Sequence, residues 1–360
     1  ILMNNIEILK QNKQSIWIDY ISKDIIESGE LKSLIEKGIT GLTSNPSIFE
    51  KAISTSDSYD EDIKILAKTN PNISKYQILE EISIKDIKNA ADLLLPTYES
   101  SSKLDGYASI EVSPYLAYNS NKTIEQAIHL SNKINMPNVL IKVPATKEGI
   151  VAIETLTEIG IKTNATLMFN QSHYINVAES FIRGAINNSS KENSFSVASF
   201  FVSRVDTAVD ELIANYKEIT GILGKTAVYN SQLAYLNFLK KFNDENSNYI
   251  QKPLWGSTST KNQNYSSTLY VDELVAPNSI NTMPLETIHE FTKNGNPKNY
   301  NGWDAAFIQK QLDKLDKYNI DLKQITQSLQ DDGIKLFQDS FDNLLKSIEN
   351  KLKTISKNIN

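Results

Sequence analysis

The run Val139-Leu140-Ile141-Lys142-Val143-Pro144-Ala145-Thr146 decides how the rest of the chain is interpreted. Five of the six residues from 139 to 144 are apolar and one is a lysine. An apolar run of this length, bounded by proline and polar residues, predicts a strand that is buried on both faces. Burying an ammonium group is costly, so this lysine tends to lose its proton and become the nucleophilic amine that Schiff-base chemistry requires. The alternative is a lysine at the strand end whose side chain reaches water.

Predicted strands and helices alternate about eight times along the chain. Strands are predicted at 15–20, from 39 onward, and at 108–114, 139–144, 163–169, 196–206, 253–258 and 279–284. Helices are predicted at 4–14, 24–37, 57–104 with breaks at Pro71 and Pro96, 123–133, 148–159, 172–185, 207–216, 224–242, and 305–352 with a break near 319–321. This alternation indicates a parallel sheet whose strands are joined by helical crossovers.

The fold class follows from the number of units. Eight units without a glycine-rich phosphate loop after the first strand favour a closed (β/α)8 barrel, the TIM barrel, over a doubly wound sheet. We expect a single domain over residues 1–360. Its core is expected at roughly 15–300, with additional N-terminal helices and a C-terminal helical extension at 301–360.

Composition limits the classes of partner. The net charge of −6 argues against a nucleic-acid surface, so any phosphate recognition must come from a few local lysines and arginines. The lack of cysteine excludes thiolate metal sites, and His129, His173 and His289 do not have the spacing of metal ligands. No apolar stretch approaches the ~20 residues of a membrane span and no signal peptide opens the chain, so we expect a cytoplasmic protein with no membrane contact.

Polar residues stand at the ends of six consecutive predicted strands. In a (β/α)8 barrel these ends meet at one mouth, where catalytic groups lie. The residues are Asp19, Asn45, Glu111, Lys142, Asn164, Thr166, Ser199 and Arg204. Two carboxylates and a lysine in otherwise apolar strands suit a Schiff-base enzyme with an amine nucleophile and two proton carriers. Alternatively, each carboxylate caps the next helix and Asn45 is only a turn residue.

Seven longer motifs occur in order over roughly residues 15–290. They are Gly41-Leu42-Thr43-Ser44-Asn45-Pro46-Ser47-Ile48-Phe49, Ile110-Glu111-Val112-Ser113-Pro114, Ile141-Lys142-Val143-Pro144-Ala145-Thr146, Asn164-Ala165-Thr166-Leu167, Ser199-Phe200-Phe201-Val202-Ser203-Arg204-Val205-Asp206, Pro253-Leu254-Trp255-Gly256-Ser257-Thr258-Ser259-Thr260-Lys261-Asn262 and Thr268-Leu269-Tyr270-Val271-Asp272-Glu273-Leu274. Together they resemble transaldolase, and most of all its longer bacterial form.

The resemblance implies a class I aldolase-type barrel that needs no metal or organic cofactor. Such an enzyme transfers a dihydroxyacetone unit between sedoheptulose 7-phosphate or fructose 6-phosphate and glyceraldehyde 3-phosphate or erythrose 4-phosphate, in the non-oxidative pentose phosphate pathway. By position, Lys142 matches the Schiff-base lysine and Asp19 the residue that takes the proton of the C4 hydroxyl. Glu111 matches the general acid/base, acting through a water that Thr166 also holds.

The resemblance also implies a set of substrate-binding residues. Asn45, Asn164 and Ser199 match groups that bind the dihydroxyacetone hydroxyls, and Arg204 matches a phosphate-binding arginine. Lys261 falls where shorter family members carry a second phosphate-binding arginine; a lysine there offers a point charge and not a fork. Phe201 completes the predicted substrate-binding set.

Two other functions remain open at this point. Fructose-6-phosphate aldolase, a related lyase that releases free dihydroxyacetone, is much shorter and carries Gln at the position of Glu111 and Tyr at that of Phe201. A non-catalytic barrel that binds sugar phosphates is the second alternative, because fold alone does not establish function. Sugar phosphates are the expected partners, and the oligomeric state is left open between monomer and homodimer.

Overall fold

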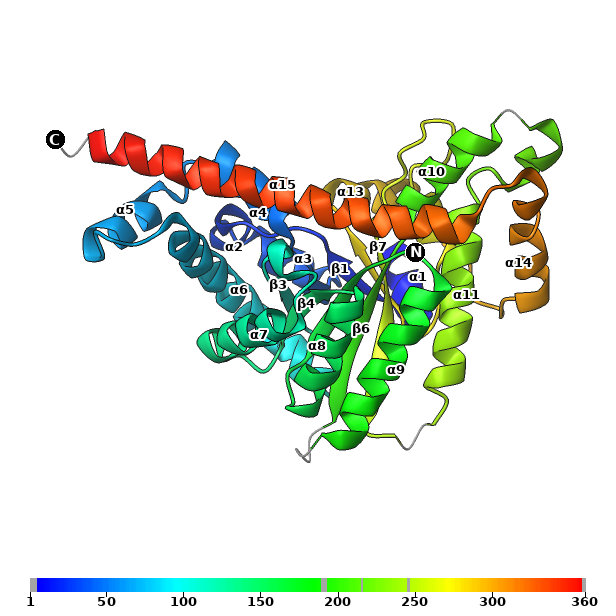
Figure 1. The fold of residues 1–360 in the computed structure, drawn as a ribbon, viewed down its shortest axis with the longest axis horizontal. Coiled ribbons are helices and arrows are strands. Elements are labelled where there is room, and N and C mark those ends of the chain that lie inside the picture. The colour runs from blue at the N-terminus through cyan, green and yellow to red at the C-terminus, as the bar shows by residue number, and fades with distance from the viewer. Residues whose placement is uncertain (1–4, 189–192, 215, 245–246, 358–360) are drawn as a thin grey trace.

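The structure is a computed structural model that describes residues 5–188, 193–214, 216–244 and 247–357. Eight parallel strands form a closed barrel in chain order, and β8 pairs with β1. The strands are β1 (Ser15–Ile18), β2 (Gly41–Leu42), β3 (Ala108–Glu111), β4 (Val139–Pro144), β5 (Thr163–Met168), β6 (Ser194–Phe201), β7 (Tyr249–Gly256) and β8 (Ile280–Met283). The predicted (β/α)8 barrel with additional helices is confirmed (Figure 1).

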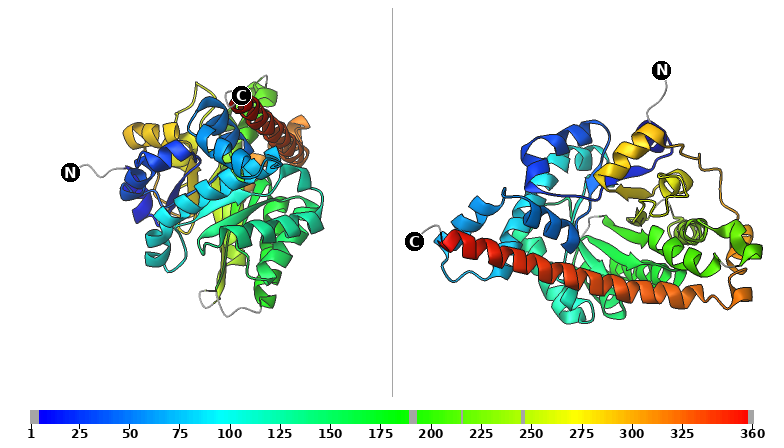
Figure 2. Two further views of the ribbon diagram at one scale, coloured as in Figure 1. Left: turned by 90° about the vertical axis from the view of Figure 1, so that its left-hand side faces the viewer. Right: turned by 90° about the horizontal axis from the view of Figure 1, so that it is seen from above.

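Helices surround the barrel and extend beyond it (Figures 1 and 2). Those up to β8 are α1 (Asn5–Gln11), α2 (Lys23–Glu27), α3 (Glu30–Glu36), α4 (Pro46–Thr55), α5 (Asp60–Thr69), α6 (Lys75–Ser100), η1 (Pro114–Leu116), α7 (Ser120–Ile134), α8 (Lys147–Glu158), α9 (Gln171–Asn187), α10 (Ser203–Ile213), η2 (Lys217–Ile222), α11 (Thr226–Lys241) and α12 (Leu269–Glu273). After β8 come α13 (Leu285–Asn294), α14 (Ala305–Leu312), η3 (Asp316–Tyr318) and α15 (Leu322–Lys357).

Aromatic side chains fill the end of the barrel at which the strands begin. Trp17, Tyr107 and Phe195 are buried there in one apolar cluster, and the Tyr107 and Phe195 rings stack with centroids 4.6 Å apart. Gly41 leaves room for this packing, because a Cβ at that position would lie 2.4 Å from the Trp17 ring. With this end filled, a substrate has to reach the barrel from the opposite end, where the strands terminate.

Two helix predictions are wrong. Residues 24–37 form two helices, α2 and α3, because Gly29 between them takes the left-handed φ of +79°. Pro96 does not break α6, which runs from Lys75 to Ser100. A proline leaves the carbonyl four residues earlier, that of Asp92, without its helical bond; both residues are exposed, so water can take that place.

Two strand boundaries differ from the prediction, and some helices were not predicted. The strand predicted at 196–206 ends at Phe201, and α10 begins at Ser203, so Arg204 lies in the first turn of a helix. Strand β7 begins at Tyr249 and not at 253. The prediction missed its start because Gln251 and Lys252 are polar, although both are buried at the filled end of the barrel. Helices α4, α12 and α13 were not predicted.

The 36-residue helix α15 runs along the side of the barrel at which β5 ends and packs on α4, α5, α6 and α10 (Figures 1 and 2). The predicted break near 319–321 is confirmed: Asn319 takes a φ of +57° between η3 and α15. The helix buries Ile334, Phe337, Leu344 and Ile348 against the rest of the chain. The division into a core at 15–300 and an extension at 301–360 stays a prediction.

Candidate active site

Lys142 lies on β4 inside the mouth of the barrel. It is 4 % exposed, and its Nζ donates a 2.8 Å hydrogen bond to the carbonyl of Ser44. The same Nζ lies 3.3 Å from Oε2 of Glu111, which follows from the register because Glu111 of β3 pairs directly with Lys142. The alternative of a lysine that reaches water is therefore wrong, and the predicted buried amine is confirmed.

The two predicted carboxylates flank this amine. Burial raises the pKa of both Glu111 and Asp19 above their usual values, although the nearby Lys142 charge opposes the shift. Asp19 directly follows β1, and its Oδ1 accepts a 2.6 Å bond from the Thr43 hydroxyl. Oε2 of Glu111 faces the Lys142 amine, whereas Oε1 is buried with no hydrogen-bond partner among the described residues. Carboxyl groups with raised pKa values beside an amine are suited to proton transfer.

Asn164 and Ser199 form one hydrogen-bonded pair on neighbouring strands. The Ser199 hydroxyl donates to Asn164 Oδ1 at 2.6 Å, and Asn164 Nδ2 donates to the Ser109 hydroxyl at 3.1 Å. Both side chains are buried. The pairing fixes which way each group points, and leaves the second Asn164 N–H available to a ligand.

Asn45 caps a helix and also lines the pocket, while its substrate-binding role stays a prediction. Its Oδ1 accepts a 3.0 Å bond from the Ile48 N–H and so caps α4, with Pro46 in the first turn. It also lines the pocket that contains Lys142. A capping residue is held in one orientation, which suits a group that must meet a substrate.

Thr166 lies at an irregularity in β5. The pairing of β5 with β6 runs regularly to Ala165–Ala198 and resumes at Met168–Phe200, so Thr166 and Leu167 together stand opposite Ser199. This is a β-bulge, a feature that redirects side chains near active sites. The Thr166 hydroxyl is buried and has no hydrogen-bond partner within the described part of the chain.

Cationic residues mark the outer part of the pocket. Arg204 is half-buried with its guanidinium carbon 5.6 Å from the centre of the Phe201 ring, and it forms no ion pair with any described residue. Lys261 is exposed, and its Nζ lies 3.5 Å from the Ser259 hydroxyl. A buried guanidinium without an anionic partner is suited to bind an anion.

These groups surround a pocket of about 160 Å³. Its lining is Asp19, Thr43, Asn45, Lys142, Thr166, Ser199, Phe201, Arg204, Leu254, Gly256, Ser257, Ser259, Lys261, Thr282, Pro284 and Phe337. The structure thus brings eight of the ten predicted residues to one pocket wall. Glu111 and Asn164 do not line it but contact Lys142 and Ser199, which do.

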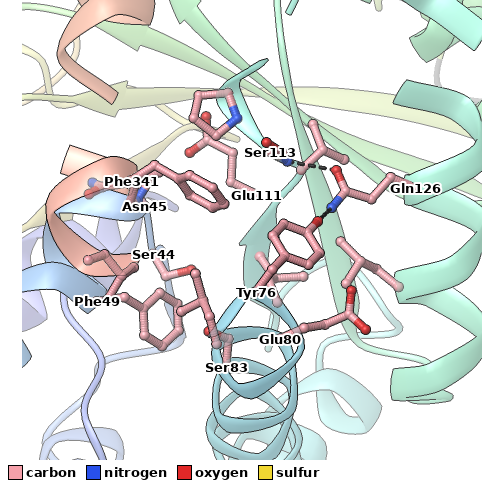
Figure 3. Close-up of a pocket in the computed structure, with 17 residues that line it drawn as sticks. Ser44, Asn45, Phe49, Tyr76, Glu80, Ser83, Glu111, Ser113, Gln126 and Phe341 are labelled. Carbon is pink, nitrogen blue, oxygen red and sulfur yellow. Dashed lines mark hydrogen bonds between the residues drawn. The ribbon is translucent and has the colours of Figure 1, made fainter. Parts of the chain in front are cut away.

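A second cavity of about 60 Å³ lies on the other side of Glu111, between α6, η1, α7 and α15. Figure 3 shows it bordered by Glu111, Phe49, Tyr76 and Phe341, with Tyr76 hydrogen-bonded to Gln126. Asn45 borders both cavities.

Eight of the sixteen lining residues were not predicted as site residues, and three of them, Thr43, Thr282 and Phe337, show what the prediction lacked. Thr43 and Thr282 share a 2.7 Å hydrogen bond that positions the donor to Asp19. Thr43 lies within a quoted motif and Thr282 within the predicted eighth strand, so a strand-end position was the available signal. Phe337 comes from α15, where an apolar residue in an amphipathic helix gives no indication that it meets the barrel mouth.

The described residues contain no group of three or more potential metal ligands in a common position. Within the described ranges, every helix is too short or too polar to cross a membrane.

The chain resembles known proteins over nearly its whole length. Residues 16–348 match the family model described as transaldolase/fructose-6-phosphate aldolase. The chain is 38% identical over 379 aligned residues to a protein named transaldolase 2 from Nostoc sp., covering 98% of this chain and 99% of that protein. Transaldolases of Mycolicibacterium smegmatis and Mycobacterium tuberculosis are 37% and 36% identical, each over 98% of this chain and 99% and 98% of their own lengths.

Proposed function

The chain belongs to the transaldolase/fructose-6-phosphate aldolase family, and from that premise we propose that its pocket transfers a dihydroxyacetone unit between sugar phosphates through a Schiff base on Lys142. This is the activity of a transaldolase, a transferase of the non-oxidative pentose phosphate pathway. The observation that carries the proposal is a buried amine at the pocket, 3.3 Å from Glu111 Oε2. An amine so placed can attack a ketone and exchange protons with its neighbour.

The first step forms the Schiff base. The neutral Lys142 amine attacks C2 of fructose 6-phosphate or sedoheptulose 7-phosphate and gives a carbinolamine. Glu111 and a water shared with Thr166 carry protons from nitrogen to oxygen, and loss of water leaves an iminium ion. The proposal is supported by Glu111 Oε1 and the Thr166 hydroxyl, which are buried with no hydrogen-bond partner among the described residues.

The second step breaks the C3–C4 bond. The iminium ion draws the electron pair of that bond toward C2 when Asp19 removes the proton of the C4 hydroxyl. An aldose phosphate leaves, glyceraldehyde 3-phosphate or erythrose 4-phosphate, and an enamine stays on Lys142. Burial raises the pKa of Asp19, which favours proton uptake. A second aldose phosphate then enters, and the same steps in reverse give the product.

The remaining residues bind the substrate in this proposal. Asn45, Asn164 and Ser199 contact the hydroxyls of the dihydroxyacetone unit. Arg204 binds the phosphate, with Lys261 contributing a second positive charge and Phe201 packing beneath the guanidinium. The support is that Arg204 has no anionic partner among the described residues and lies in the same pocket as Lys142.

The test is a transfer assay on the purified chain. Fructose 6-phosphate is supplied with and without erythrose 4-phosphate, and glyceraldehyde 3-phosphate, sedoheptulose 7-phosphate and free dihydroxyacetone are followed. We expect triose phosphate and sedoheptulose 7-phosphate only when the acceptor is present. Free dihydroxyacetone without acceptor would instead establish the lyase, and neither product would establish a non-catalytic barrel.

We further propose that the chain acts in the cytoplasm, as a monomer or a homodimer. Cell fractionation with antibodies to the chain tests the compartment. Sedimentation equilibrium tests the assembly.

A further inference from the structure

The bulge in β5 holds a residue in an unfavourable backbone conformation. Leu167, the second residue of the bulge, has a φ of +59°. A residue with a Cβ avoids this left-handed region, and such a conformation persists only where surrounding contacts fix it. Leu167 is fully buried and lies next to Thr166, which we place on the catalytic water. The contacts that hold Leu167 therefore also fix where the Thr166 hydroxyl points.

Those contacts come from α15, more than 160 residues further along the chain. The side-chain amide of Gln330 donates to the Leu167 carbonyl at 2.9 Å and to the Ala145 carbonyl at 3.1 Å. Ala145 follows β4, and its N–H donates to the Thr166 carbonyl at 2.8 Å. One buried amide thus joins the ends of the two strands that carry Lys142 and Thr166.

Gly333, one turn beyond Gln330, contributes the second contact. A Cβ at this position would lie 2.9 Å from Leu167 Cδ2 and 3.6 Å from an Arg204 guanidinium nitrogen. Glycine inside a helix costs stability relative to alanine. Its presence here lets α15 approach the bulge closely enough for the Leu167 side chain to be enclosed.

Further hydrogen bonds hold the same face of α15 on the segment after β5. Asn170 Nδ2 donates to the Thr326 hydroxyl at 3.1 Å, and His173 Nε2 lies 3.1 Å from Gln327 Oε1. Gln327 Nε2 donates in turn to Gln330 Oε1 at 3.2 Å. The Gln330 amide therefore has a partner on both its oxygen and its nitrogen and is fixed in one orientation.

We propose that Gln330 and Gly333 of α15 are positioning residues that clamp the β5 bulge and thereby aim the Thr166 hydroxyl at the catalytic water. The inference rests on the proposed Schiff-base function. On this view the C-terminal helix is part of the catalytic apparatus, acting on dehydration of the carbinolamine through Thr166. Gln330 bonds Leu167, Ala145 and Gln327 and, among the described residues, no phosphate-binding residue. Loss of its amide should therefore lower a rate and leave substrate affinity unchanged.

The test is Gln330→Leu, which keeps the side-chain volume but removes both donors. After mixing with fructose 6-phosphate, the adduct is trapped with borohydride at timed intervals, and transfer kinetics are measured in parallel. We expect adduct formation to slow about tenfold, from the loss of two hydrogen bonds, with KM changed by less than about twofold. Gln338→Leu is the matched control, because Gln338 on the same helix bonds the Pro114 carbonyl and not the bulge; it should keep the wild-type rate.

A double-mutant cycle with Thr166→Val separates positioning from general destabilisation. If Gln330 acts through Thr166, Gln330→Leu should slow the Thr166→Val enzyme little further; independent, multiplicative losses would overturn the clamp. Gly333→Ala gives a second test, because alanine favours the helix while displacing Leu167. We expect slower adduct formation, and a wild-type rate would also overturn the clamp. Failure of the wild-type chain to form any adduct would instead refute the proposed function.

Discussion

Replacing Asp206 with asparagine should stabilise the folded chain at neutral and alkaline pH. Asp206 lies on α10, two residues after Arg204, and is 1 % exposed. Burial raises its pKa from 3.8 to about 7, a shift that the nearby Asp210 charge increases. Its carboxyl accepts from the Ala227 N–H at 2.7 Å and from the Tyr270 hydroxyl at 2.9 Å.

The sign of the effect follows from proton binding. The folded chain holds the Asp206 proton up to about pH 7, whereas the unfolded chain releases it near 3.8. Because the unfolded state binds fewer protons in that interval, the free energy of unfolding falls as pH rises through it. Between pH 3.8 and about pH 7 the free energy of unfolding therefore falls by at most about 4 kcal/mol, at roughly 1.4 kcal/mol for each pH unit.

An asparagine at position 206 does not ionise, so it avoids the loss of stability with rising pH, and it can keep both hydrogen bonds of Asp206. Its amide oxygen can accept from the Ala227 N–H, and its NH2 group can donate to the Tyr270 hydroxyl. Asp206→Asn should therefore match the wild-type chain near about pH 4 and become up to about 4 kcal/mol more stable near about pH 8.

The measurement is urea unfolding of both proteins across this pH range, comparing midpoints and slopes. Asp92→Asn, a substitution of an exposed aspartate on α6, is the control and should stay within about 0.5 kcal/mol of wild type throughout. A stability difference that does not change with pH, or a variant less stable than wild type near about pH 8, would refute the reasoning.

Three further substitutions test the site. Lys142→Met should abolish the borohydride-trapped adduct, whereas Lys252→Met, at the other buried strand lysine, should retain it; an adduct surviving in the first variant would remove Lys142 from the mechanism. Glu111→Gln should lower the transfer rate by about a hundredfold or more, measured as kcat, and an unchanged rate would exclude its role in proton transfer. Arg204→Ala should raise KM for phosphorylated substrates by about tenfold to a hundredfold. The control is Arg183→Ala, which removes an exposed arginine paired with an acid and should leave KM unchanged. If the two variants have equal KM values, the phosphate binds elsewhere.

The barrel was predictable from the sequence because its strands are short apolar runs with helices between them. The errors arose where tertiary contacts outweigh local pattern. Pro96 stays within α6 at an exposed position, and Asp92, whose carbonyl it leaves unbonded, is exposed as well. The start of β7 was missed because Gln251 and Lys252 are polar but buried, with Gln251 bonded to the Ser196 hydroxyl and Lys252 to the Leu104 carbonyl.

Most of the site was predicted from one expectation, that polar residues at the ends of neighbouring parallel strands lie close together. This strand-end rule makes no use of the helices. It depends on parallel strands ending at one mouth, so position along each strand was enough to predict Asp19, Glu111, Lys142 and Thr166 as neighbours. The strand-end rule could not predict that α15 contacts the site, because the contacts of Gln330 and Gly333 with β5 join residues more than 160 positions apart. It also gave no indication of the bulge, since the register is a property of two strands together.

Lys142 and Lys252 are both buried strand lysines, but only the surroundings of Lys142 suit the proposed Schiff-base chemistry. Both lie in barrel strands, are less than 10 % exposed and donate from Nζ to a backbone carbonyl. Lys252 lies at the filled end of the barrel, where Trp17, Tyr107 and Phe195 leave a substrate no room. Lys142 lies at the opposite end, beside Glu111 and a pocket of about 160 Å³ that Phe337 of α15 helps to enclose. Burial near a carboxyl group does not separate the two lysines, since Lys252 has Asp105 nearby. What distinguishes Lys142, the proposed nucleophile, is Glu111 at 3.3 Å and the pocket beside it.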